Sequence, residues 1–538
     1  MIAPYTAHVD TFARDNLPPR ELWPELIFET PDLQYPARLN CVVELLDKAV
    51  AAGHGERPAI RAPRRVLTYT ALLELVNRIA RVLREDLGLV PGNRVLLRAP
   101  NNPMLAACWL AVVKAGLIAV ATMPLLRARE LVPVIERARV DAALCDAALR
   151  EEMELARAQC AGLGPVLYFN TDAPGSLDVL QAGKPSNFEA IDTSAEDVCI
   201  IAFTSGTTGM PKGTMHFHRD VLAICDCFPP ACLQATPDDI FCGTPPLAFT
   251  FGLGGLLLFP LRVGASTVLI ERLTPTLLLS AIEERRATIC FTAPTFYRQM
   301  APVAFEYDIA SLRKCVSAGE ALPSATRELW EKETGVRLID GIGATELLHI
   351  FISAAGDDIR AGATGKPVPG YRACVLDVEG NPLPAGQVGR LAVKGPTGCR
   401  YLADERQASY VENAWNVTGD AYLVDEDGYF WYQARTDDMI VSAGYNIAGP
   451  EVESALLMHP GVAECGVVGV PDEARGQIVK AVVVLRQGFA AGPETARALQ
   501  DFVKRTIAPY KYPRAVEFRE ALPRTETGKL QRFKLREG

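Results

Sequence analysis

The sequence shows neither a signal peptide nor a segment that is expected to form a membrane-spanning helix. Its first 19 residues contain no basic start followed by an apolar run, so no signal peptide is expected. Two stretches, 106–126 and 248–270, are apolar, but Lys114 and Pro124 interrupt the first and four glycines interrupt the second. A membrane-spanning helix needs about 20 uninterrupted apolar residues. Each stretch is therefore predicted to be a buried helix followed by a strand.

A disulfide framework is also absent. The 14 cysteines are scattered between Cys41 and Cys465 of a long chain, unlike the dense cysteines of small disulfide-stabilised domains. Cys225 and Cys227 form a C-x-C pair, but a zinc site would need a second Cys/His pair at ligand spacing, and we find none in the sequence. We expect small buried thiols and a cytoplasmic, reducing location.

Internal repeats, low-complexity segments and an excess of positive charge are missing as well. The formal net charge of −9 argues against a nucleic-acid partner. A polyanionic cofactor would then need a local cluster of backbone N–H groups and basic side chains. Hydrophobic residues make up 49% and charged residues 22% of 538 positions, which excludes a disordered chain, a coiled coil and a collagen. That length allows about three to four domains.

Helical and strand patterns alternate along much of the chain. Strands are predicted at 94–100, 117–122 and 141–146, with helices at 103–115 and 128–138 between them. This order is typical of βαβ units with a parallel sheet. The same alternation returns further along the chain, at 266–270, 281–286, 289–292 and 314–317.

The last third of the chain differs in composition and in the length of its predicted strands. After about residue 365, glycine and proline become dense and the strands short, which predicts a small antiparallel barrel or sheet. Another unit begins near Asp437. Its predicted elements are typical of a compact α+β domain, with helices at 450–457 and 495–506 and strands at 465–470 and 479–485.

One glycine- and hydroxyl-rich segment, residues 204–213, is suited to binding phosphate. It follows a predicted strand at 198–203, and we expect a helix after it. Small residues let backbone N–H groups surround phosphate oxygens, while hydroxyls and a lysine add donors and charge. The candidate phosphate-binding residues are Thr204, Ser205, Gly206, Thr207, Thr208, Gly209 and Lys212. Lys212 is followed by Gly213 rather than Ser or Thr, so this is not a Walker-type loop. A flexible linker is disfavoured between a buried strand and a helix.

Further segments carry groups that suit a nucleotide. The Asp420 carboxylate can accept two hydrogen bonds from a ribose diol, and Arg435 can donate to sugar or phosphate. Thr345 offers a hydroxyl to phosphate, and Glu346 offers a hard oxygen ligand for Mg²⁺. Lys529 lies in a polar loop next to Gly528, which by composition alone would be only a mobile tail.

Together these segments resemble the signatures of the adenylate-forming superfamily, which includes acyl-CoA synthetases, luciferases and peptide-synthetase adenylation domains. Six segments match in the family's order: 204–213, 317–321, 340–346, 418–420, 433–435 and 524–529. The resemblance implies that Gly319, Glu320 and Ala321 contact adenine, that Asp340 and Gly341 contact the nucleotide, and that Asp420 and Arg435 bind ribose. It implies catalytic roles for Lys529, Thr345 and Glu346, with Mg²⁺ held by Glu346. In the C-terminal part it implies a hinge at Asp437 and pantetheine contacts near Gly444 and Tyr445.

The resemblance also implies the fold and the reaction. The fold class would be α/β, with a large N-terminal domain (1–436) of parallel α/β subdomains plus a small β-barrel, followed by a small mobile α+β domain (437–538). ATP would activate a carboxylate as an acyl-adenylate, and coenzyme A would then displace AMP. Many CoA ligases have lysine where this chain has Val441, so no lysine of that loop is expected to assist. The basic residues Lys504, Arg505, Lys511 and Arg514 suit either the CoA phosphates or a solvated face.

The nature of the acid is suggested by two segments. Phe249 stands where histidine is common in relatives, and no aspartate is present to hold an α-amino group, which disfavours an amino acid. The pattern T-E-x-x-H-I-F with an aromatic–glycine segment resembles benzoate-CoA and 2-aminobenzoate-CoA ligases, and the segments 7–19 and 438–446 favour 2-aminobenzoate. The candidate pocket walls are Phe249, Phe251, Gly341, Ile342 and Gly343, with His349 as the polar contact.

Several alternatives stay open at this point. The acid could be benzoate or another aryl or short acyl acid, and His349 could be a structural histidine. A peptide-synthetase module would need a carrier domain, and none is expected after residue 538. Luciferase-type oxidation is compatible with the motifs, although CoA is the commoner acceptor. A non-catalytic nucleotide-binding protein would be expected to lack Lys529 or Glu346. We expect no membrane partner, and a monomer or a homodimer.

Overall fold

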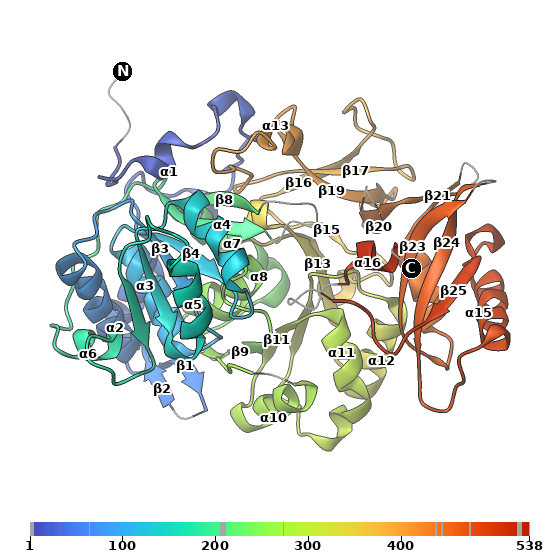
Figure 1. Ribbon diagram of the computed structural model, residues 1–538, viewed down its shortest axis with the longest axis horizontal. Helices are drawn as coiled ribbons and strands as arrows, with labels where there is room; N and C mark the ends of the chain where they lie inside the picture. Colours follow the sequence, from blue (N-terminus) through green and yellow to red (C-terminus); the bar gives the residue numbers. More distant parts are fainter. Residues whose placement is uncertain are drawn as a thin grey trace.

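The computed structural model describes residues 5–63, 65–204, 211–272, 274–435, 438–442, 445–472, 475–524 and 530–536, with the backbone alone at 441, 445 and 446. Two large sheets with their helices form the left and centre of the molecule in Figure 1, an antiparallel sheet lies above them, and the C-terminal unit lies at the right. The expected α/β class and its additional antiparallel and α+β parts are confirmed.

The first large sheet has six strands in the order β6-β5-β3-β4-β7-β8. All neighbours are parallel except β7 and β8, which form an antiparallel pair. The predicted strand–helix alternation is confirmed by β3 (Arg94–Arg98), α3 (Pro103–Lys114), β4 (Ile118–Thr122), α4 (Ala128–Ala138), β5 (Ala142–Asp146), α5 (Arg150–Arg157), β6 (Val166–Phe169), α6 (Leu177–Ala182), β7 (Val198–Thr204) and β8 (Lys212–Phe217).

The second large sheet has nine strands in the order β15-β14-β13-β12-β11-β9-β10-β1-β2, parallel from β13 to β1. Its strands are β1 (Pro58–Ala62), β2 (Arg65–Thr68), β9 (Ile240–Gly243), β10 (Ser266–Val268), β11 (Ile289–Thr292), β12 (Lys314–Ser317), β13 (Leu338–Gly343), β14 (Ile350–Ser353) and β15 (Lys366–Pro367). The helices around it include α2 (Tyr69–Arg81), α7 (His218–Phe228), α10 (Pro275–Arg285), α11 (Pro294–Met300) and α12 (Ser324–Thr334).

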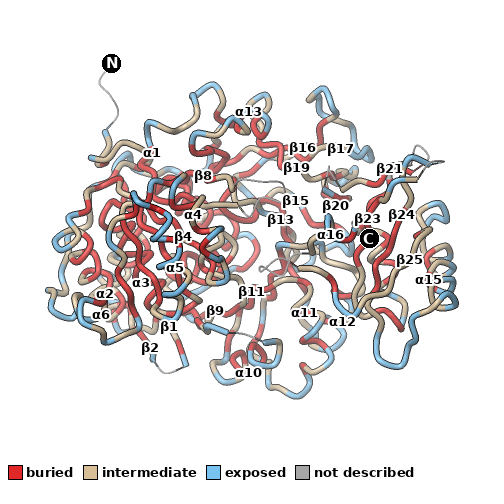
Figure 2. The backbone as a smooth tube through the Cα atoms, viewed as in Figure 1, coloured by how far each residue is buried: buried red, intermediate tan, exposed pale blue. Residues whose placement is uncertain are grey.

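Both apolar stretches are buried helix followed by strand, as predicted. The first is α3 and β4, which belong to the core shown in red in Figure 2. Lys114, which interrupts this stretch, is itself fully buried, and its Nζ donates to Asp47 Oδ1 at 2.6 Å. The second stretch comprises α8 (Thr250–Leu253), η8 (Gly254–Leu258), α9 (Phe259–Val263) and β10. No helix among the described residues is long and apolar enough to cross a membrane.

One predicted connection is wrong. The segment after β7 was expected to lead into a helix, but it leads into β8, so the phosphate-binding segment joins two antiparallel strands. β8 is buried along nearly its whole length, and its run of buried residues has no helical period. Helix α7 begins only at His218, once the strand has ended.

The antiparallel sheet and the C-terminal α+β unit have the types of secondary structure that the sequence predicts. The antiparallel sheet contains β16 (Arg372–Leu376), β17 (Val388–Lys394), β18 (Val411–Glu412), β19 (Trp415–Val424) and β20 (Phe430–Arg435), with α13 (Gln407–Tyr410) beside it. The C-terminal unit contains β21 (Ile440–Ser442), β22 (Tyr445–Ile447), α14 (Gly449–Leu457), β23 (Val462–Asp472), β24 (Gly476–Leu485), α15 (Pro493–Thr506), β25 (Ala515–Phe518) and α16 (Arg532–Arg536). It has an apolar core of its own.

Candidate active site

The phosphate-binding segment is held at the open end of the β7–β8 hairpin. Thr204, the last residue of β7, pairs with Lys212, the first residue of β8. Between them, Ser205, Gly206, Thr207, Thr208 and Gly209 lie outside the described residues. The Lys212 Nζ lies 3.4 Å from the hydroxyl of Tyr401 and 5.0 Å from the centre of its ring. The hairpin thus directs one positive charge toward Tyr401.

Tyr401 joins this hairpin to the Thr-Glu motif. Its hydroxyl donates to Glu346 Oε1 at 2.5 Å, and both side chains are buried. Burial and the nearby Glu346 carboxylate raise the pKa of Tyr401 far above its ordinary value, so the hydroxyl stays a donor. Lys212 and Glu346, predicted separately, are therefore brought together through a residue that the sequence analysis missed. No local signal marks Tyr401, because its partners come from distant segments.

A second link fixes the backbone of the Thr-Glu motif. His216 Nε2 lies 2.8 Å from the carbonyl oxygen of Thr345, and a carbonyl can only accept, so this nitrogen carries the proton. His216 Nδ1 lies 3.7 Å from Asp220, whose carboxylate also receives Arg400 at 2.6 Å. All three side chains are buried. This network holds Thr345 and Glu346 against the phosphate hairpin.

The adenine turn follows the carboxyl end of β12, where ligands bind in open α/β sheets. Gly319, Glu320 and Ala321 form this turn, and Gly319 has a φ of 90°, which favours glycine. Glu320 accepts from Thr295 Oγ1 at 2.7 Å and pairs with Arg524 at 3.2 Å.

The neighbouring strand β13 brings Asp340 and Gly341 beside this turn. Asp340 lies opposite Ser317, the last residue of β12, in parallel register. Burial raises the pKa of Asp340 to about 7, although the positive charge of Arg327 opposes the shift. Near neutral pH this carboxyl is therefore poised between its neutral and ionised forms.

The two residues predicted to bind ribose, Asp420 and Arg435, lie together in the structure. Asp420 on β19 lies directly opposite Arg435 on β20, and their charged groups are 3.2 Å apart. Asp420 is largely buried, while the Arg435 side chain is 48% exposed, so the pair can present both groups to a ligand. Gly419 has a φ of 77°, and an added Cβ would lie 2.9 Å from Arg435 Nη2, which leaves little room for a side chain there.

The predicted catalytic lysine loop is described only at its two flanks. Arg524 and Leu530 form an antiparallel bridge, and Lys529 lies between them, outside the described residues. Arg524 pairs with Glu320 of the adenine turn at 3.2 Å and with Glu464 of the C-terminal unit at 3.1 Å. This end of the C-terminal unit therefore lies at the adenine turn. Asp437, Gly444 and the Tyr445 side chain are also outside the described residues.

His349 occupies an aromatic cluster. Its ring is 2% exposed and packs against Phe228, Phe251, Phe259 and Phe291, with ring centres 5.6, 5.7, 4.5 and 6.4 Å away. Burial lowers its pKa to about 3, so the ring is neutral. Among the described residues, neither ring nitrogen makes a hydrogen bond of good geometry, although the backbone of Phe251 lies near enough to oppose the fall in pKa. A buried imidazole without partners differs from a satisfied structural histidine.

The other candidate pocket residues divide into two groups. Gly343 lies directly against the backbone of His349, and Ile342 beside it on β13 packs on the same core. Phe251 contacts His349, as given above. Phe249 instead lines a narrow cavity with Trp109 and Ile200, next to the strand that leads to the phosphate hairpin. The structure thus brings Phe251 and Gly343 to His349, with Ile342 next to Gly343 in the chain, while no ring contact between Phe249 and His349 occurs among the described residues.

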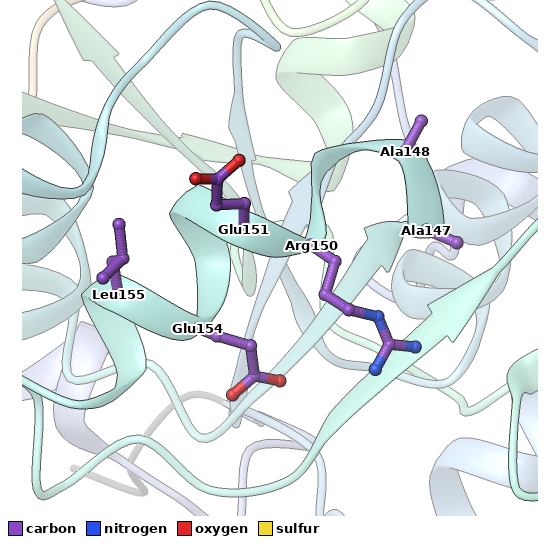
Figure 3. Close-up of a pocket in the computed structure, with 6 residues that line it drawn as sticks. All are labelled: Ala147, Ala148, Arg150, Glu151, Glu154 and Leu155. Carbon is purple, nitrogen blue, oxygen red and sulfur yellow. The ribbon is translucent and has the colours of Figure 1, made fainter.

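Two further surface features contribute little to the site. In the basic group, Lys511 pairs with Glu451 and Lys504 with Asp501, so half of its charge is already paired. Figure 3 shows a shallow hollow beside α5, lined by residues from Ala147 to Leu155. It contains none of the candidate site residues.

Comparison with known proteins agrees with this arrangement. The sequence profile of the family described as AMP-binding enzyme matches residues 47–401, and that of the AMP-binding enzyme C-terminal domain matches residues 451–529. The chain is 37% identical to benzoate–CoA ligase of Thauera aromatica, an alignment that covers 94% of this chain and 97% of that protein.

Two solved structures are similar over nearly the whole chain. The anthranilate CoA ligase AuaEII in complex with anthranoyl-AMP has a TM-score of 0.90 and 34% identity, covering 94% of this chain and 98% of that one. A benzoate CoA ligase from Burkholderia xenovorans LB400 has a TM-score of 0.85 and 31% identity, covering 93% and 100%.

The matches to both family models and the similarity to a benzoate–CoA ligase over nearly the whole chain define an adenylate-forming enzyme. The chain belongs to the AMP-binding enzyme family. Within that family it is an AMP-forming acyl-CoA synthetase, an acid–thiol ligase of the aryl-CoA ligase branch.

Proposed function

We propose that this acyl-CoA synthetase acts on an aromatic carboxylate, and that 2-aminobenzoate is its preferred acid. ATP activates the carboxylate as an acyl-adenylate with release of pyrophosphate, and coenzyme A then displaces AMP to give the aryl thioester. The observation that carries this proposal is the neutral, unpartnered imidazole of His349 among four phenylalanine rings.

These surroundings favour a flat apolar ligand with one polar substituent. Aromatic side chains bind another ring through offset or edge-to-face contacts worth about 1 kcal/mol beyond burial. A buried polar group without a partner costs about 1–3 kcal/mol, and a ligand that supplies the partner recovers this free energy. An ortho-amino group can hydrogen-bond to a neutral imidazole. The printed names of two relatives, a benzoate and an anthranilate ligase, support the same substrate class.

The nucleotide half of the reaction uses the groups around Tyr401. Lys212 and the backbone of the phosphate segment bind the phosphates, while Asp420 and Arg435 hold the ribose. Glu346 suits Mg²⁺, because it is a hard oxygen donor and, among the described residues, only its Oε1 is engaged by Tyr401. Magnesium bound there would neutralise charge on the phosphates. Thr345 supplies a hydroxyl to them.

Lys529 stabilises the charge that develops between the carboxylate and the α-phosphorus. The Arg524–Glu320 pair supports this role, because it holds the residue that precedes the loop at the predicted adenine turn. The two proposed units, 1–436 and 437–538, have different roles in the reaction. The larger unit binds ATP and the acid, and the smaller one rotates about Asp437 to bring Gly444 and Tyr445 toward coenzyme A.

Steady-state kinetics with three acids test the substrate class. We expect kcat/KM to be highest for 2-aminobenzoate, lower for benzoate and lowest for a long-chain fatty acid, with AMP formation as the readout. A preference for the fatty acid contradicts the aryl proposal. Equal kcat/KM values for 2-aminobenzoate and benzoate would contradict the proposed preference for the amino group and leave only the aryl-acid proposal.

A variant connects this preference to the imidazole. His349→Leu should lower kcat/KM for 2-aminobenzoate about 10-fold more than for benzoate, because only the former loses a hydrogen bond of about 1–1.5 kcal/mol. The matched control is His54→Leu, since His54 is exposed and lies outside the pocket. An equal loss for both acids would contradict the role of His349 in recognising the amino group.

A further inference from the structure

One buried asparagine makes two hydrogen bonds to the segment that leads into the candidate acid pocket. Asn101 follows β3 in the chain and is 7% exposed. Its side-chain Nδ2 donates to the carbonyl oxygen of Pro245 at 2.9 Å, and its Oδ1 accepts from the backbone N–H of Leu247 at 2.8 Å. The side-chain amide therefore bridges the two residues on either side of Pro246, and the proposed reaction gives Asn101 no role.

The two prolines explain why a side chain holds this segment. Pro245 and Pro246 have no backbone N–H, so the segment has few donors of its own. Leu247 is 3% exposed, and a buried N–H requires a partner. An amide side chain carries one donor group and one acceptor on the same planar unit, which matches a carbonyl and an N–H on neighbouring residues. A carboxylate supplies no donor, and an aliphatic side chain supplies neither group.

The held segment continues directly into the aromatic residues of the candidate pocket. The Phe249 N–H donates to the carbonyl oxygen of Pro246 at 3.0 Å, and Phe249 is the N-cap of α8. Within α8, Phe251 packs against the His349 ring. The first turn of α8 lies close to the held segment, because a Cβ added at Gly252 would be 2.1 Å from the Pro246 carbonyl oxygen. A shift of Pro246 would therefore move both phenylalanine rings.

The position of Asn101 is itself fixed by the start of helix α3. Asn102 is the N-cap of this helix, and its Oδ1 accepts from the Leu105 N–H at 3.0 Å. Further along the same helix, Trp109 lines the narrow cavity that Phe249 also lines. The segment that follows β9 of the second large sheet is therefore held against α3 of the first sheet at two places.

We propose that Asn101 is a positioning residue for acid specificity, which holds Phe249 and Phe251 in place before the acid binds. This inference rests on the proposed function, because it takes these two rings as walls of the acid pocket. Walls that are already ordered lose less conformational entropy when a ligand binds, which favours the acid that fits them. Without Asn101 the segment keeps its anchor at Thr244, whose N–H donates to the Phe291 carbonyl oxygen at 3.1 Å.

Asn101→Ala, compared with Asn102→Ala, separates positioning from stability. Both asparagines are buried, and Asn102→Ala removes the N-cap of α3, so both variants should have a lower Tm than wild type. Only Asn101→Ala should lower kcat/KM for 2-aminobenzoate, by about 10-fold, with a higher KM for the acid and an unchanged KM for ATP. Asn102→Ala should rank the acids as wild type does. Equal loss of acid selectivity in both variants would overturn the proposal.

A second variant separates hydrogen bonding from side-chain volume. Asn101→Asp keeps the size of the side chain, but its ionised carboxylate cannot donate to Pro245 and repels that carbonyl oxygen. We expect Asn101→Asp to lose acid selectivity as Asn101→Ala does. Selectivity equal to that of wild type would overturn the role of the hydrogen bonds.

Hydrogen exchange of the wild-type protein needs no variant and so does not depend on whether the variants fold. The peptide that covers residues 244–253 should exchange slowly without the acid and change little when the acid binds, because Asn101 already orders it. Rapid exchange that slows only on acid binding would overturn the proposal.

The acid panel distinguishes failure of this inference from failure of the proposed function. A wild type that prefers a long-chain fatty acid contradicts the aryl function, while the variants compared on that acid still decide the role of Asn101. A wild type that prefers aryl acids, with the same ranking of acids in Asn101→Ala, contradicts this inference alone.

Discussion

Among the single side chains of the site, Asp340 combines a raised pKa with a predicted contact to the nucleotide. Its pKa is raised to about 7 by burial, whereas a carboxyl in an unfolded chain ionises near pH ~4. Between these values the folded chain binds more protons than the unfolded chain. The free energy of unfolding contributed by Asp340 therefore falls as pH rises from about 4 to 7.

Asp340→Asn removes this titration while keeping the shape of the side chain. We expect the variant to become progressively more stable relative to wild type as pH rises from about 5 to 8, because wild type alone then buries a charge. Thermal unfolding across this range measures the difference in Tm. The control is Asp358→Asn, because Asp358 is exposed and lies outside the site. A pH-independent difference between wild type and Asp340→Asn would contradict the assignment.

Lys529 is expected to act on only one of the two half-reactions. A well-placed donor to developing charge contributes about 3–4 kcal/mol, so Lys529→Ala should slow adenylate formation roughly 10²–10³-fold. Pyrophosphate release measures this step. Thioester formation from supplied acyl-adenylate should change much less, because it uses another face of the C-terminal unit. Lys534→Ala, at an exposed position of α16, is the control, and equal losses in both steps would refute the role.

Among the secondary-structure elements, η8 sets the position of His349. Gly254 lies so close to the imidazole that an added Cβ would be 2.4 Å from Cδ2 and 2.9 Å from Nε2. Gly254→Ala should therefore push the ring out of its aromatic cluster. We expect a stability loss of about 1–3 kcal/mol from overpacking and a loss of selectivity between 2-aminobenzoate and benzoate.

Chemical denaturation and acid selectivity measure these two effects separately. The matched control is Gly162→Ala, because a Cβ at Gly162 meets nothing within 4 Å. This control should leave both stability and selectivity unchanged. Unchanged selectivity in Gly254→Ala would show that the position of His349 does not determine which acid is preferred.

The same elements show what the sequence can and cannot predict. Strands β3, β4 and β5 were predictable because they are short apolar runs between helical segments, and α4 because its apolar residues recur at helix spacing. The pairing of Asp420 with Arg435 followed from the family signature. Tyr401 and the phenylalanine cluster around His349 were not predictable, because these contacts join residues far apart in the chain and leave no local pattern. β8 was mistaken for a helix because it is buried on both faces and shows no alternation.

For the molecule as a whole, the contact between Arg524 and Glu320 is one of the contacts that join the C-terminal unit to the rest of the chain. Arg524 pairs with Glu320 of the adenine turn and with Glu464 on β23, and it immediately precedes the loop of Lys529. This arrangement holds Arg524, which precedes the loop, at the predicted adenine turn. If that turn binds the nucleotide, we expect the arrangement to be the one used in the adenylate-forming step rather than in thioester formation.

Arg524→Gln should therefore separate the two half-reactions. The side chains of Arg524 and Glu320 are 27% and 21% exposed, so solvent screens the pair and its contribution is about 1 kcal/mol. We expect adenylate formation, followed by pyrophosphate release, to slow about 3- to 10-fold. Thioester formation from supplied acyl-adenylate should stay the same or rise, because the competing arrangement is no longer held. The control is Arg497→Gln, an exposed arginine on α15 of the same unit. Equal slowing of both steps would mean that Arg524 stabilises the C-terminal unit itself. Slowing of thioester formation alone would mean that the contact belongs to the arrangement used for thioester formation.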